Sequence, residues 1–205
     1  MKRKNILLSW IGHTDLRAMA QDSSEKIKQA VEEAVGPISS KSKIELGPVK
    51  TLTKQVEFDQ VFLLSNYKAI LNKEFTAWVE CKPLVIDISL KDPTDYVEVY
   101  SSVDKSLQSL IVKEGKDVKL NFLLSPGTPA MAAIWVLLGK TKYPATFYQT
   151  YNGKYWTTEI PFDITIDVIP ELLQDTDNYL QQFASKSPQE IQGFENIIGS
   201  SQPIK

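Results

Sequence analysis

The sequence predicts an α/β fold of the Rossmann-like type, with a mainly parallel sheet flanked by helices and an antiparallel hairpin near the C-terminal end. Strands alternate with helices along the chain, which indicates crossover connections between parallel strands. Strands such as 5–8 and 121–124 are continuous apolar runs without polar alternation, as expected for a sheet covered on both faces. The pair Asn152-Gly153 between two strand-like runs is the strongest short signal for a hairpin.

The composition is that of an ordinary globular protein and excludes several classes. The 205 residues suffice for one large domain, or for a domain with a small appendage. A net charge of -2 gives no global field that attracts nucleic acid or an anionic membrane, although it still allows a local basic groove. Cys81 is the only cysteine, which favours a reducing compartment. No apolar run is long enough for a membrane span, so we expect a cytoplasmic protein with no membrane partner.

The N-terminal half begins with an apolar strand at residues 5–10. The segment 13–46 is polar and poorly patterned, except for a helical apolar spacing over 23–36 that Gly36 closes. The other elements expected in this half are a strand at 61–64, an amphipathic helix over 67–82 and a strand over 83–90.

The C-terminal half begins with a long helix. Asp92 and Pro93 fit its N-cap and first position, Asp95 adds a second capping carboxylate, and Gly115 ends it. The elements expected after it are a strand over 118–124, a helix over 129–140, the hairpin over 145–160, a further strand at 163–169 and a short helix at 175–186.

Three turns that follow strands carry the candidate ligand-binding residues. In an open α/β sheet, ligands bind outside the carboxyl ends of the strands. The candidates are Ser9, Trp10, Gly12, His13, Thr14 and Asp15 after the first strand, Ser65 and Asn66 after the second, and Ser125, Pro126, Gly127, Thr128, Pro129 and Met131 after the strand at 118–124.

The third turn, Ser-Pro-Gly-Thr-Pro, has the chemistry of an anion site. Thr128 fits an N-cap, and Pro129 fits the first helical position. Gly127 permits close approach to the main chain, the helix start offers N–H groups to a phosphate, and Ser125 adds a hydroxyl. The same residues could serve only to turn the chain and cap the helix. The turn matches neither a Walker A loop nor the G-x-G-x-x-G pattern.

His13 is the only histidine, and it either contacts the ligand or is simply solvated. No second histidine is present to share a metal, and no nucleophile-elbow motif accompanies it. We therefore expect neither catalytic nor metal-binding residues.

The C-terminal stretch 193–205, GFENIIGSSQPIK, resembles the opening of the AAA+ module of sigma-54-dependent transcriptional activators. The matching residues are Phe194, Ile197, Ile198 and the turn 199–201. This resemblance implies an N-terminal regulatory domain of a longer protein. ATP and Mg²⁺ would then be cofactors of the AAA+ module alone, and sigma-54 RNA polymerase and DNA would be partners only through domains outside this chain.

The stretch FLLSPGTPAMAAIWVLL, with residues 47–67 and 92–100, is similar to the sensor domain of the RNA-terminal-phosphate-cyclase regulator group. That sensor belongs to the CRISPR-associated Rossmann fold (CARF) class. The resemblance covers most of residues 1–170 and implies a homodimer that binds a nucleotide or RNA-derived ligand at the loops after its first and fourth strands. It leaves 171–192 as helix and linker and 193–205 as the AAA+ start.

The sequence departs from the common CARF loop in two ways. Pro126 precedes Gly127 where paired glycines are usual, and the loop lacks a basic residue. A multiply charged RNA would therefore need cations from elsewhere, and Arg17 and Lys140 are the candidates. Two alternatives stay open: a CARF-type domain that cleaves its own cyclic ligand, with Ser9, His13 and Thr128 as candidates, and a ligand-free dimerisation domain.

Overall fold

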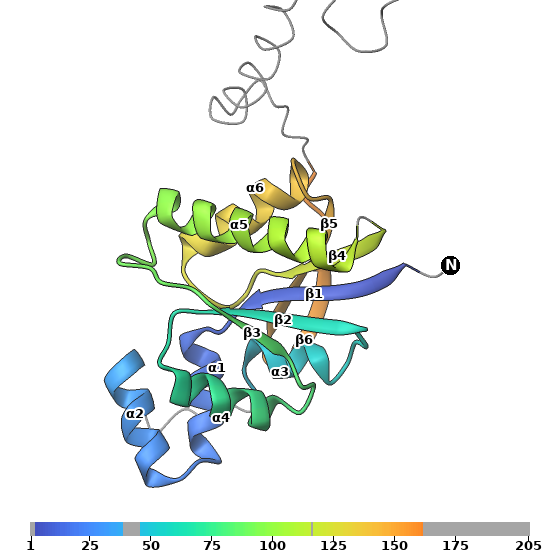
Figure 1. Cartoon of the computed structure of the whole chain (residues 1–205). Helices are drawn as coiled ribbons and strands as arrows, with labels where there is room; N and C mark the ends of the chain where they lie inside the picture. Colours follow the sequence, from blue (N-terminus) through green and yellow to red (C-terminus); the bar gives the residue numbers. More distant parts are fainter. Residues whose placement is uncertain (1–2, 39–45, 116, 162–205) are drawn as a thin grey trace, which may run out of the picture. The chain divides into compact units, whose positions relative to one another are not determined.

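In the computed structural model, residues 3–38, 46–115 and 117–161 are described, and they form a six-stranded sheet with helices on both faces (Figure 1). The strands are β1 (Lys4–Trp10), β2 (Gln60–Ser65), β3 (Leu84–Asp87), β4 (Val118–Leu123), β5 (Ala145–Tyr151) and β6 (Lys154–Thr158). Their order is β3-β2-β1-β4-β5-β6. The first five are parallel, and β6 pairs antiparallel with β5. The predicted Rossmann-like class, with its hairpin, is confirmed.

Six helices flank the sheet within the described residues. They are α1 (His13–Gln21), α2 (Glu25–Val35), α3 (Gly47–Thr53), α4 (Ala69–Val79), α5 (Tyr96–Glu114) and α6 (Pro129–Lys140). In Figure 1, α5 and α6 cover one face of the sheet, and α1, α3 and α4 cover the other. Helix α2 packs against α1 and α4. None of the described helices is long and apolar enough to cross a membrane.

Central strand β1 contributes to a separate apolar core on each face. Ile6, Leu8 and Trp10 pack with α5 and α6, whereas Leu7 packs with α1 to α4. All four side chains are almost completely buried. Removing a side chain of this size from water stabilises the fold by about 1.5–3 kcal/mol, which explains why the strand carries no polar alternation.

The sheet order places the switch point between β1 and β4. After β1 the chain continues to β2 and β3 on one side, and after β4 it continues to β5 on the other. The connections that leave these two neighbouring strands therefore diverge, which opens a crevice at their carboxyl ends.

Several expected elements differ from the structure. The long helix α5 begins at Tyr96 and not at Pro93, because Asp95 is the N-cap and accepts hydrogen bonds from the N–H groups of Val97 and Glu98. Asp92 instead closes the preceding turn by accepting from the N–H of Thr94. The sequence patterning missed α1 and α3, both within or beside the segment assigned as poorly patterned.

Four expected features lie outside the described residues. These are the strand at 163–169, the helix at 175–186, the linker at 171–192 and the AAA+ start at 193–205.

Candidate functional site

The loops that follow β1 and β4 are in direct contact at the switch point. A Cβ atom on Gly12 would lie 2.9 Å from the backbone nitrogen of Gly127 and 2.9 Å from Cβ of Pro126. Gly12 has an ordinary extended conformation, with φ -101°, so glycine is required here by the close approach and not by backbone strain. The structure thus brings together two of the three predicted ligand loops.

Helix α6 starts in this contact region and is capped by its own residues. Gly127 has φ +96°, which favours glycine, and the N–H of Thr128 points at Sδ of Met131 at 3.4 Å. The Thr128 hydroxyl accepts the N–H of Met131 at 3.3 Å and donates to the carbonyl of Pro93 at 2.7 Å. The prediction of Thr128 as N-cap and Pro129 as first helical residue is confirmed. Because both functions of its hydroxyl are used, Thr128 offers a ligand little from its side chain in this arrangement.

Helix α1 starts on the other side of the contact between the two loops, and its first turn contains the buried residue Asp15. The carboxylate is completely buried. It accepts the N–H of Gly12 at 3.0 Å and the N–H of Val49 at 2.9 Å. Burial raises the pKa of Asp15 to about 7, although these two N–H groups oppose the shift. Asp15 therefore joins the loop after β1 to the start of α3, and its side chain lies beneath the surface.

His13 and Thr14 are the exposed residues of this loop. The imidazole of His13 lies beside the Tyr67 ring, with centroids 6.4 Å apart. Partial burial, followed by the positive charge of Arg17, lowers the pKa of His13. The ring is therefore mostly neutral at pH 7, so it can offer one donor and one acceptor to a ligand.

Three other predicted ligand residues are buried at the ends of their strands. Ser9 donates its hydroxyl to the carbonyl of Trp10 at 2.9 Å. The indole Nε1 of Trp10 is buried and has no hydrogen-bond partner among the described residues. Ser65 donates to Oδ1 of Asn72 at 2.6 Å. These buried side chains lie beneath the surface of the site, whereas Asn66, next to Ser65 in the chain, is exposed.

A cavity of about 670 Å³ adjoins the two loops. Thr14 and Ser125 line it from the loops after β1 and β4, residues 46–48 and Thr51 line it from the start of α3, and residues 150–153 line it from the β5–β6 hairpin. Ser125 joins the loop after β4 to strand β5, because its hydroxyl accepts the N–H of Thr150 at 2.7 Å and donates to the carbonyl of the same residue at 3.3 Å. The described residues that line the cavity include no charged side chain.

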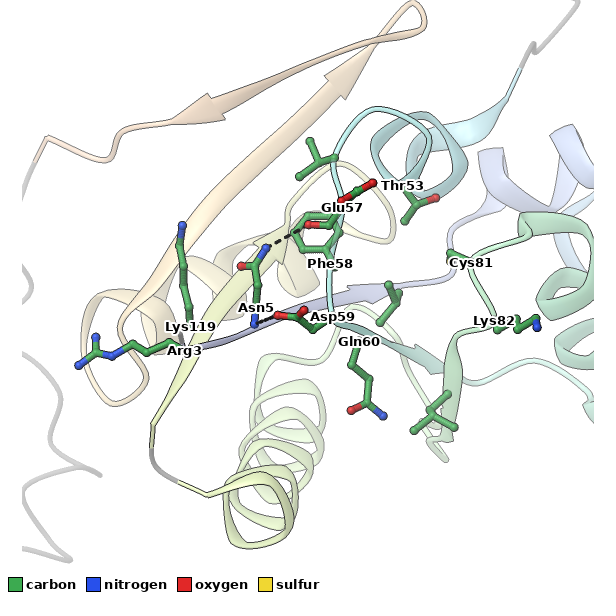
Figure 2. Close-up of a pocket in the computed structure, with 13 residues that line it drawn as sticks. Arg3, Asn5, Thr53, Glu57, Phe58, Asp59, Gln60, Cys81, Lys82 and Lys119 are labelled. Atoms are coloured by element: carbon green, nitrogen blue, oxygen red, sulfur yellow. Dashed lines mark hydrogen bonds between the residues drawn. The ribbon is translucent and has the colours of Figure 1, made fainter. Parts of the chain in front are cut away.

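A larger cavity, of about 1010 Å³, lies at the opposite edge, where the strands begin (Figure 2). Figure 2 shows Asn5 between Glu57 and Asp59: its N–H donates to Oδ2 of Asp59 at 2.6 Å, and its side-chain amide donates to the carbonyl of Glu57 at 3.1 Å. The neighbouring Arg3 pairs with Asp117. In an open α/β sheet, however, ligands bind outside the carboxyl ends of the strands and not where the strands begin. We therefore place the candidate site at the carboxyl edge.

The two cations proposed as phosphate ligands differ in position, and both donate hydrogen bonds to main-chain carbonyls. Lys140 ends α6, about 16 Å along the helix from Pro129, and donates to the carbonyl of Ile160. This position excludes Lys140 from the site at the other end of the helix. Arg17 donates to the carbonyl of Val35 at 2.6 Å, at the end of α2. The charge of Arg17 still reaches the loop after β1, since it adds to the effect of burial in lowering the pKa of His13. The positive groups at the two loops are thus Arg17 and the backbone N–H groups at the helix starts.

The start of α3 and the β5–β6 hairpin adjoin the site, although the sequence did not predict either as part of it. Gly47 approaches Cα of Asp15 so closely that a Cβ would lie 2.9 Å away. The Gly47-Pro48 pair was a readable helix-start signal, because proline favours the first turn. The hairpin was recognised, but its position at the site depends on β5 being parallel to β4.

The described residues contain no cluster of three or more histidine, cysteine or acidic side chains that could hold a metal ion. What the site offers is hydrogen bonding from two helix starts, hydroxyls and amides.

No family model and no curated protein matches the chain. Among solved structures, a similar one is Csm6 of Enterococcus italicus bound to cyclic hexa-2'-fluoro-hexa-dAMP. The two sequences are 16% identical, and the match covers 87% of this chain and 39% of that chain with a TM-score of 0.49. The chain thus spans about two fifths of the length of that protein. The Rossmann-like fold class rests on the strand order and hairpin of the chain itself.

Proposed function

We propose that this chain is the ligand-sensing domain of a sigma-54-dependent transcriptional activator, and that it binds a nucleotide or RNA-derived ligand at the loops after β1 and β4. The observation that carries the proposal is the contact of Gly12 with Pro126 and Gly127 at the switch point. This contact sets the starts of α1 and α6 side by side at the edge where α/β sheets bind ligands.

A phosphate group suits this arrangement. The start of α1 offers the N–H groups of His13 and Thr14. The start of α6 offers that of Ala130, because Pro129 has no N–H and Met131 donates to Thr128. The helix dipoles place partial positive charge at the same points. Glycine in both loops allows the close packing that brings the two helix starts together, because protein atoms fill the space beside Gly12 and Gly127. Because the adjoining cavity has no charged lining among its described residues, the site favours a ligand with few negative charges per binding site over a long RNA.

The regulatory part of the proposal is supported by the resemblance of 193–205 to the start of an AAA+ module. The ligand can change the activity of an attached ATPase only if it binds one conformation of the protein more tightly than another. We infer that the parent protein hydrolyses ATP at a rate that depends on this ligand.

The regulatory proposal includes a homodimer. Tyr96 and Val97, at the start of α5, are 56% and 67% exposed. They lie close to the site, because the carbonyl of Pro93 accepts a hydrogen bond from Thr128. Exposed apolar side chains of this kind are typical of protein interfaces. Light scattering of the 205-residue chain should give the mass of a dimer, and Val97→Glu should give the mass of a monomer; a monomeric unmodified chain would exclude this interface.

Isothermal titration calorimetry tests ligand binding. We would titrate cyclic oligoadenylates, RNA oligomers with a terminal cyclic phosphate, and the four nucleoside monophosphates into the chain. At least one should bind, and Gly12→Ala should bind the same compound about tenfold or more weakly. A folded protein that gives no heat with any of these compounds would refute the proposal.

We propose binding without cleavage. Of the three candidates for ligand cleavage, Ser9 is buried and Thr128 uses its hydroxyl within the protein. His13 is the only exposed residue of the three, and a single general base is left without the two hydroxyls proposed to act with it. Incubation with cyclic tetra-adenylate and cyclic hexa-adenylate should therefore yield no linear product by mass spectrometry, and a linear product that requires His13 would contradict this part of the proposal.

A further inference from the structure

The cavity beside the two glycine loops has the chemistry of a recognition site for an uncharged, flat group. Its lining combines hydroxyls from Thr14, Thr51 and Ser125 with the amide of Asn152 and the phenol of Tyr151. Its volume of about 670 Å³ falls in the range of small-molecule sites. The proposed phosphate site at the two glycine loops uses none of the cavity residues that come from α3 or from the hairpin.

Tyr151 is the most unusual of these residues. It ends β5 and is 70% exposed, although it is a large aromatic residue that lines a cavity. Such a ring leaves its apolar faces in water, and stacking against a flat partner would remove them from water.

The hairpin that carries Tyr151 is held in place by its tight turn and by hydrogen bonds to neighbouring segments. Asn152 and Gly153 adopt φ values of +48° and +69°, which make the tight turn between β5 and β6. Gln55 donates to the carbonyl of Gly153 at 3.2 Å and so joins the turn to the segment after α3. At the base of the hairpin, the bonds between Ser125 and Thr150 fix β5 to the loop after β4.

The cavity wall also carries an unused polar group. Oγ1 of Thr150 is buried and has no hydrogen-bond partner among the described residues. A buried hydroxyl without a partner is unfavourable, so a ligand atom that reached it would be bound more tightly.

The distance to the phosphate loops is short. Thr14 and Ser125 line the cavity, and each lies two residues from the glycine of its own loop. Two residues span at most about 7 Å. A single ligand can therefore contact both the glycine loops and the cavity.

We propose that this cavity is a nucleobase subsite, in which Tyr151 stacks on the base and Asn152 bonds to its edge while the phosphate lies at the starts of α1 and α6. An aromatic ring is suited to this role because every base has a flat face that can stack. The side chain of Asn152 offers both a donor and an acceptor, which is what the edge of a base requires. This inference rests on the proposed function and adds the part of the nucleotide that the glycine loops do not contact.

The test compares ligands that differ only by the base or the phosphate. Calorimetry of the chain with the four nucleoside 5′-monophosphates, the corresponding nucleosides and ribose 5-phosphate separates the two contributions. We expect at least one monophosphate to bind about 5- to 150-fold more tightly than ribose 5-phosphate, the range of one base–aromatic stack. Tyr151→Ala should reduce its affinity to that of ribose 5-phosphate, whereas Tyr151→Phe should keep it.

Trp156→Ala is the matched control. Trp156 is an exposed aromatic residue of the same hairpin that does not line the cavity, so its replacement should leave the affinity unchanged. If the monophosphates bind no more tightly than ribose 5-phosphate, or if Tyr151→Ala binds as the unmodified chain does, the base subsite is refuted while the phosphate site stands. Binding of a nucleoside without binding of ribose 5-phosphate would support the base subsite and contradict the phosphate site. Absence of binding by all compounds would refute both.

Discussion

Replacement of Gly12 by alanine tests the contact on which the candidate site depends. The added Cβ would lie 2.9 Å from main-chain and side-chain atoms of the loop after β4, whereas ordinary van der Waals contact begins at 3.4 Å. One loop must therefore move by about 0.5 Å, and neither neighbour is the flexible end of a side chain. We expect this overpacking to lower the free energy of unfolding by about 1–3 kcal/mol. Alanine adopts φ -101° freely, so the cost should arise from the clash alone.

The same displacement should weaken ligand binding. A shift of this size moves the N–H groups of one loop relative to the other, and we expect a loss of affinity of about tenfold or more for the nucleotide that binds best. Urea unfolding measures the stability, and calorimetry measures the affinity.

Gly36→Ala provides a control of similar stability cost. Gly36 has φ +79° and no heavy atom within 4 Å of an added Cβ, so alanine there incurs backbone strain of about 1–2 kcal/mol without touching the site. It should bind ligand as the unmodified chain does. If Gly12→Ala unfolds at the same urea concentration as the unmodified chain and binds with equal affinity, the two loops are not in the contact described, and the reasoning fails.

Three further predictions concern the elements around the site. Thr128→Ala should destabilise the fold by about 1–2 kcal/mol in urea unfolding, because it removes the cap of α6 and the hydrogen bond to the carbonyl of Pro93. Thr128→Ser should recover most of that loss, and equal stability of the two variants would contradict the capping role. Burial raises the pKa of Asp15 to about 7, so the Asp15 carboxyl group holds its proton more tightly in the folded protein than in the unfolded chain. The stability that results should be fully present below about pH 4 and should be lost as the pH rises to 7. The difference in unfolding free energy between the unmodified chain and Asp15→Asn should therefore fall over that range, and a difference that stays constant from pH 4 to pH 8 would disprove it. Gly139→Ala should lower the melting temperature, because its Cβ would lie 2.6 Å from the ring of Phe147 in the core, and an unchanged melting temperature would show that the ring can move aside.

The sequence predicted the strands and the helix α6 well because their signals are local. Apolar runs of strand length without alternation mark strands that are buried on both faces, and β1, β2 and β4 lie at or next to the predicted ranges. For α6, Thr128 and Pro129 fixed the start to the residue, because a cap and a proline act through their own backbone geometry. Asn152-Gly153 likewise fixed the hairpin.

The start of α5 shows the limit of such signals. Asp92 before Pro93 and Asp95 before Tyr96 are both reasonable caps in the sequence. The structure chooses Asp95, whose carboxylate accepts two N–H groups of the first helical turn, whereas Asp92 closes a turn before it. Two competing local signals three residues apart cannot be ranked from the sequence, because the choice depends on how the helix packs on the sheet.

The sequence by itself determined the order of most elements, the fold class and the existence of a glycine-containing turn between β4 and α6, for which anion binding stays a prediction. Each of these follows from side-chain periodicity or from backbone conformations that single residues impose. Only the tertiary structure decided that Gly12 touches Gly127, that Asp15 lies buried between α1 and α3, and that Tyr151 faces the same cavity as Ser125. These contacts join residues from about 30 to more than 100 positions apart, and no local preference encodes them. They arise because strand order at the switch point determines which loops share one edge of the sheet.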